Sequence, residues 1–124
     1  MKAYFGRRYT LSASHRLHAE TLSDEENRAA YGKCNNPHGH GHNYVIEVLV
    51  GGEVDQETGM VMNLADLDAM MQTNVLERFD HVNLNLDLLF GKQVPTTDNL
   101  CREVFKLVSN MLPTSMLEYV RIDE

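Results

Sequence analysis

Residues 38–42 alternate histidine and glycine, and they lead directly into residues 40–50, the most strand-like segment of the chain. Aromatic and β-branched side chains, beginning with Tyr44, Val45 and Ile46, favour an extended strand there. In a strand, residues two apart point to the same face, with Cα atoms about 6.5 to 7 Å apart. Two imidazoles at that separation can converge on one ion, because a Zn–N bond spans about 2.0 to 2.1 Å. The segment therefore predicts a strand with a metal site at its start.

A third ligand has to come from another part of the chain, and residues 2–15 alternate in a way that predicts a second strand ending at His15. If this strand pairs antiparallel with residues 40–50, His15 lies beside the other histidines. Three histidines with an open fourth position form a catalytic zinc arrangement rather than a closed structural one. Spacing alone does not choose between His38 and its neighbours, or between His15 and His18. The alternative interpretation is a flexible polar turn that binds no metal.

The remaining pattern predicts a single α+β domain over residues 1–124, in which two helices pack on one face of an antiparallel β-sheet. A short helix within residues 21–31 begins with a capping box, in which Ser23 is followed by Glu26. Gly51-Gly52 is expected to end the central strand. The other expected elements are a turn at 55–59, a return strand at 60–62, helices at 63–79 and from 97 to Pro113, and a final strand at 117–122. The sheet face without helices is left for a partner subunit.

The charge of the chain excludes several classes of partner. The formal net charge is -7 and no basic run exceeds Arg7-Arg8. Nucleic acids and anionic membranes both require a basic face, so neither is expected as the main partner. The two cysteines are too few for a small disulfide scaffold. With no signal peptide or membrane span in the sequence, we expect a cytoplasmic protein with reduced thiols.

Two further features suggest acid–base chemistry. Cys34 lies six residues before His40 in a loop rich in glycine and asparagine. It is either a buried, inert thiol or, if a bound cation lowers its pKa, a base. Asp80 and His81 are adjacent in sequence and follow a predicted helix, where a histidine is favoured by the helix dipole alone. By themselves, therefore, these two residues are weak evidence of a site.

Several segments together resemble the 6-pyruvoyl-tetrahydropterin synthase family. They run almost from end to end: residues 12–17, 22–27, 32–44, 58–67, 76–84 and 95–97. The most specific of them is a cysteine followed, after five residues, by His-Gly-His. The resemblance implies a tunnelling-type fold that closes into a barrel on oligomerisation, with hexamers built as dimers of trimers.

The resemblance also implies an activity, that of a zinc-dependent lyase. Such an enzyme converts 7,8-dihydroneopterin triphosphate to 6-pyruvoyl-tetrahydropterin and triphosphate. The implied roles are zinc ligation by His15, His40 and His42, proton abstraction by Cys34, a second acid–base unit of Asp80 and His81, and pterin binding by Glu124, Thr96 and Thr97. Family members continue past this glutamate into one more short strand, whereas this sequence stops at Glu124.

Two rival functions follow from the same residues. The 6-carboxy-tetrahydropterin synthases of deazapurine biosynthesis use the same substrate, but they usually have a shorter gap between the cysteine and His-Gly-His. A non-catalytic zinc- or pterin-binding module would not need Cys34 together with Asp80 and His81. Candidates for the triphosphate-binding residues are Arg7, Arg8, Arg16 and Lys92.

Overall fold

The alternating segments form a long antiparallel hairpin that is the centre of the fold. A computed structural model describes residues 1–124, with β1 at Lys2–His15 and β2 at His40–Glu53. The short β3, Val82–Asn83, pairs parallel with β1, and β4, Leu117–Asp123, pairs antiparallel with β2. The strand order is β3-β1-β2-β4. The predicted α+β class is therefore confirmed, although the two-residue β3 makes one edge of the sheet parallel.

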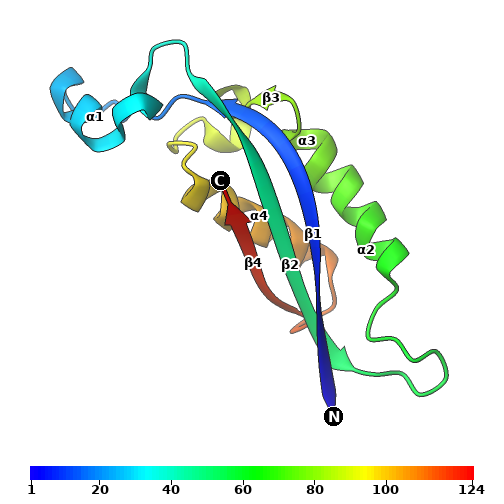
Figure 1. Cartoon of the computed structure of the whole chain (residues 1–124). Helices are drawn as coiled ribbons and strands as arrows, with labels where there is room; N and C mark the ends of the chain where they lie inside the picture. Colours follow the sequence, from blue (N-terminus) through cyan, green and yellow to red (C-terminus); the bar gives the residue numbers. More distant parts are fainter.

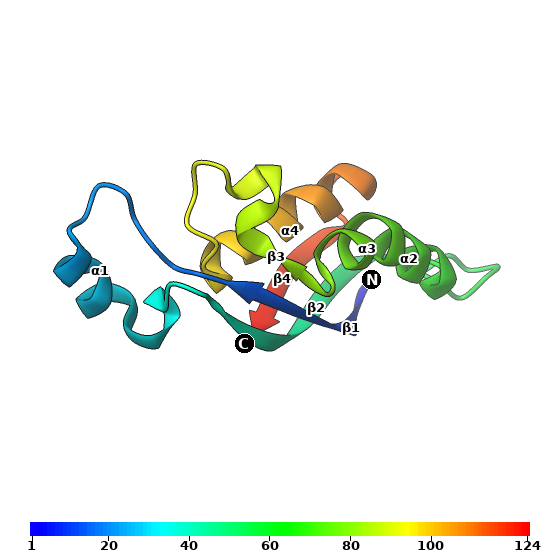
Figure 2. The ribbon, with the colours of Figure 1, turned by 90° about the horizontal axis from the view of Figure 1, so that it is seen from above.

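Three of the helices, α2 (Leu64–Met71), α3 (Glu77–Phe79) and α4 (Thr97–Met111), cover the same face of this sheet, as Figures 1 and 2 show. The side chains buried between the two layers come from alternate strand positions, such as Tyr44, Ile46 and Val48, and from one stripe of each helix. Burying each large apolar side chain contributes about 1.5 to 3 kcal/mol. The opposite sheet face carries no helix (Figure 2). None of the helices has both the length and the apolar character that a membrane span requires.

The predicted helix over residues 63–79 is interrupted by a π-helical segment, Gln72–Leu76. Over the whole of residues 63–79 the buried side chains recur every four positions, at Leu67, Met71, Val75 and Phe79. Because an α-helix turns about 100° per residue, a spacing of four drifts about 40° at each step. A π-turn holds more residues than an α-turn and takes up part of this drift. As a result, the last residue of the series still faces the sheet.

Two sequence predictions near the end of β2 are wrong. The strand does not stop at Gly51-Gly52 but continues to Glu53, because both glycines pair with β1. A Cβ on Gly51 would lie 2.3 Å from the ring of Tyr4, so the glycine accommodates an aromatic side chain across the hairpin. Residues 60–62 form an irregular bend rather than a return strand. Along residues 45–50 both sides of β2 are already occupied, by β1 and by β4, so residues 60–62 cannot pair with that part of the strand.

The connection between β1 and β2 carries α1, Asp24–Tyr31, and a 3-10 turn, Gly32–Asn35. The predicted capping box is present, because Ser23 and Glu26 exchange side chain to backbone hydrogen bonds. Both ribbon views show α1 beyond the end of the sheet (Figures 1 and 2). The fully buried Asn27 ties α1 to the incoming chain, donating to the carbonyl of Ala19 and accepting from its amide. This connection begins and ends at two of the predicted ligands, His15 and His40.

Candidate metal centre

The pairing of β1 with β2 brings three histidines together. His15 lies directly opposite His40, and Ala13 lies opposite His42, so strand alternation puts all three imidazoles on the helix-covered face. The Nε2 atom of His40 lies 3.0 Å from that of His15 and 3.1 Å from that of His42. In a tetrahedral zinc site, bond lengths of 2.0 to 2.1 Å would separate ligand nitrogens by about 3.3 Å. The cluster therefore has nearly the size that a single small cation requires.

The tautomer of His15 also suits a metal ligand. Its Nδ1 lies 2.8 Å from the carbonyl oxygen of Pro95, and its side chain is buried. A carbonyl only accepts hydrogen bonds, so Nδ1 carries the proton and the lone pair of Nε2 faces the other histidines. Burial also lowers the pKa of His15, which favours the neutral imidazole that metals bind. The chemistry of these donors fits a divalent ion.

Cys34 joins this cluster from the 3-10 turn before β2. Its Sγ and the ring nitrogens of the three histidines all lie within 4.8 Å of one another. The turn is held against the chain that follows His15: Leu17 donates its amide to the Cys34 carbonyl at 2.8 Å, and the buried Asn35 donates to the Leu17 carbonyl at 2.7 Å. Without an ion, burial and the charge of Glu124 raise the pKa of the Cys34 thiol. A bound cation would act in the opposite direction.

Glu124 lies at the same centre. Its Oε1 is 3.0 Å from Nε2 of His42 and 3.8 Å from Nε2 of His15. Thr96 and Thr97 follow Pro95, whose carbonyl contacts His15. The hydroxyl of Thr96 caps α4 by accepting the amide of Asn99, and Thr97 is the first residue of that helix. Of the three predicted substrate-binding residues, Glu124 therefore contacts the histidine cluster directly, and Thr96 and Thr97 follow the proline that contacts His15.

The structure does not bring Asp80 and His81 into contact with Cys34. The Asp80 carboxylate accepts hydrogen bonds from Nδ1 of His81 at 2.9 Å and from the amide of Ser12 at 2.8 Å. His81 is four-fifths exposed and adopts a positive φ of 59°. It borders the same shallow hollow as His42, but no hydrogen bond joins the pair to the cluster.

The two alternative histidines lie outside the cluster. The Nδ1 atom of His18 lies 3.0 Å from the side-chain nitrogen of Asn35, and the side chain of His38 is exposed. The pairing register thus brings His15, His40 and His42 together and leaves the other two histidines apart. The Pro95 carbonyl and Asn35 were not predicted from the sequence, because a backbone oxygen and a loop amide carry no pattern of their own.

Comparisons with known proteins agree with these observations. The family model described as 6-pyruvoyl tetrahydropterin synthase matches residues 4–124. The human protein called 6-pyruvoyl tetrahydrobiopterin synthase is 47% identical over 124 residues, which are 99% of this chain and 86% of the human one. A solved structure of 6-pyruvoyl tetrahydropterin synthase from Caenorhabditis elegans superposes with a TM-score of 0.94 at 43% identity, covering 100% of this chain and 89% of that one. A putative 6-carboxy-5,6,7,8-tetrahydropterin synthase from Archaeoglobus fulgidus is 39% identical, but over only 53% of this chain and 52% of that protein.

Proposed function

The chain belongs to the 6-pyruvoyl tetrahydropterin synthase family, and from this premise we propose that it is a zinc-dependent lyase acting on 7,8-dihydroneopterin triphosphate. The products are 6-pyruvoyl-tetrahydropterin and triphosphate. The observation that carries the proposal is the convergence of one thiol and three imidazoles within 4.8 Å. The redox change is internal to the substrate, so the reaction needs no nicotinamide or flavin.

His15, His40 and His42 are the proposed ligands. Zinc bound there would supply Lewis-acid polarisation of the substrate's side-chain oxygens. Cys34, as thiolate, takes a proton from the neighbouring carbon. This role needs a free thiol, and both cysteines are unpaired, as expected for a protein in the cytoplasm.

The remaining roles concern proton return and orientation. Asp80 and His81 return a proton to the adjacent carbon, and the hydrogen bond from His81 Nδ1 to Asp80 fixes which ring nitrogen is available. Glu124 accepts hydrogen bonds from the pterin N–H groups, with Thr96 and Thr97 beside it. Anchoring the ring in this way fixes the position of the reacting side chain relative to Cys34.

We further propose that the active unit is a homo-oligomer, a hexamer built as a dimer of trimers, with the site near a subunit interface. Three observations support assembly: a sheet face without helices, the free edge of β4, and a Cys34 cluster that does not include Asp80 or His81 of the same chain. An exposed strand edge offers unpaired backbone groups to another copy. Light scattering that finds a monomer at micromolar concentration would contradict this assembly.

The direct test is to incubate the zinc-loaded protein with dihydroneopterin triphosphate and identify the products by mass. We expect equal amounts of 6-pyruvoyl-tetrahydropterin and triphosphate. A product with a carboxyl group in place of the pyruvoyl group would assign the chain to the 6-carboxy reaction. Tight pterin binding without turnover would instead identify a non-catalytic binding module.

A further inference from the structure

A pocket of about 530 Å³ lies beside the metal centre, between α1, the 3-10 turn and the start of β2. His40 is part of its wall, so the pocket is continuous with the histidine cluster. None of its nine lining residues is hydrophobic. Its basic and amide side chains suit a charged, hydrogen-bonding group of a ligand.

The charge of this pocket is opposite to that of the chain. Arg16, Arg28 and Lys33 line it, with Asp24 as the one carboxylate, whereas the whole chain has a net charge of -7. None of the three basic side chains lies within 4.0 Å of a carboxylate oxygen. Elsewhere four arginines are paired with carboxylates at 2.9 to 3.1 Å: Arg7, Arg8, Arg78 and Arg121. The pocket thus keeps its cations free in a protein that has carboxylates in excess.

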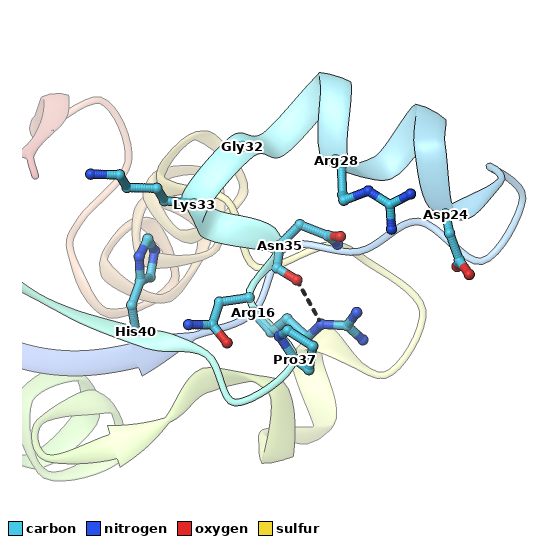
Figure 3. Close-up of a pocket in the computed structure, with 9 residues that line it drawn as sticks. Arg16, Asp24, Arg28, Gly32, Lys33, Asn35, Pro37 and His40 are labelled. Carbon is cyan, nitrogen blue, oxygen red and sulfur yellow. Dashed lines mark hydrogen bonds between the residues drawn. The ribbon is translucent and has the colours of Figure 1, made fainter.

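These cations are spread along the pocket rather than focused on one point. In Figure 3 the guanidinium groups of Arg16 and Arg28 lie on the side of Asp24, while Lys33 extends on the side of His40. Arg16 is half-buried, and its Nε donates to the carbonyl of Asn35 at 3.3 Å. That bond orients the guanidinium and leaves its terminal N–H groups for a ligand. A row of separated cations matches a chain of phosphates better than a single phosphate.

We propose that this pocket binds an oligophosphate chain and, resting on the proposed function, that it holds the triphosphate of the substrate through Arg16, Arg28 and Lys33. The pterin then lies toward Glu124, the reacting side chain lies at the histidines, and the triphosphate extends past His40. When the C–O bond breaks, the triphosphate leaves with the electron pair, and the three cations compensate its added charge.

The test uses metal-free protein, so that chelation of zinc does not contribute, and inorganic triphosphate as the probe in titration calorimetry at low salt. We expect R28A and K33A each to weaken binding about 5-fold, and the double variant about 25-fold, as screened charge-assisted contacts imply. K2A is the matched control, because Lys2 is an exposed lysine without a carboxylate partner at the far end of β1; it should bind as the wild type does. D24N should bind triphosphate more tightly than the wild type does. The wild type should bind inorganic monophosphate more weakly than triphosphate.

The outcomes separate this inference from the proposed function. If R28A/K33A binds triphosphate as tightly as K2A, or if D24N has no effect, the pocket is not the oligophosphate site. In turnover, the double variant should raise KM for the phosphorylated substrate while leaving the zinc content unchanged. Pterin products from a protein whose KM is insensitive to R28A/K33A would overturn the pocket and keep the function. Triphosphate binding with the expected effects of the variants, but without a pterin product, would support the pocket and overturn the proposed lyase function.

Discussion

If the backbone around Pro95 orients the buried His15 of the metal centre, removing the side chain of Asn99 should weaken zinc binding. Its side-chain nitrogen donates to the carbonyl of Val94 at 2.8 Å, and this segment presents the Pro95 oxygen to His15. The change N99A removes that bond, at a net cost of about 1 kcal/mol. Alanine's higher helix propensity returns about 0.5 kcal/mol of this in the first turn of α4. For a domain of this size the remainder lowers Tm by only about 2 °C.

The expected loss of metal affinity is larger than this loss of stability. Groups that orient a metal-binding histidine typically contribute 10- to 100-fold in affinity. Because the Thr96 amide also donates to the Val94 carbonyl, at 2.8 Å, part of the geometry survives, and we expect about a 10-fold loss for N99A. The assay is zinc titration in competition with a chromophoric chelator, alongside thermal unfolding.

The matched control is N74A. The side chain of Asn74 also donates to a backbone carbonyl, that of Met70, at 3.0 Å, but it is exposed and remote from the site. It should bind zinc within about 2-fold of the wild type, since exposed contacts away from a site have small effects. Equal zinc affinity of N99A and N74A would refute the idea that this segment orients His15.

Three further predictions concern the site and its support. C34A should keep zinc but lose at least about 100-fold in turnover, whereas H40A should lose both; zinc loss by C34A in proportion to activity would make the thiol a ligand. G39A should weaken zinc binding, because φ at this position is +74° and the new Cβ would lie 3.0 Å from the last backbone oxygen of β1; G59A, with φ of +72° and no neighbour within 4 Å, should lose stability alone. D87N should lower Tm by more at pH 7 than at pH 2.5. The hydrogen bond from Arg78 holds the pKa of this carboxyl below its usual value, so its stabilisation is complete at neutral pH and decreases progressively as the pH falls from about 4 through the lowered pKa. A constant difference in Tm between the two pH values would contradict this.

Local patterns were sufficient to predict the elements that dominate the fold. Alternation, although weakened by two arginines and Gly6, located β1, and the Ser23–Glu26 pair located the start of α1. The sequence could not reveal β3, because two residues carry no periodicity. The bend at 60–62 was misassigned for a related reason: three apolar residues suit a strand, but only the complete sheet decides whether an edge is free for them.

The candidate site was predictable only in part. Strand parity put His40 and His42 on one face, and pairing with the first strand brought in His15. The free cations of the pocket were not predictable, because Arg28 and Lys33 lie on a helix and a turn whose position depends on tertiary hydrogen bonds such as those of Asn27. Of the four basic residues proposed from the sequence, Arg16 lines the pocket, Arg7 and Arg8 are held in ion pairs elsewhere, and Lys92 lines a different pocket.

The connection at residues 16–39 leaves the sheet at His15 and returns to it at the residue directly opposite, His40. Because its ends are held together by the hairpin, changing its length should cost little: doubling a flexible loop costs only about 0.6 kcal/mol in closure entropy. The three imidazoles project from the strands β1 and β2, whereas the basic side chains of the pocket belong to this connection. Exchanging this connection in evolution would therefore change which anionic groups of a substrate are recognised, while the histidines on the strands stayed the same.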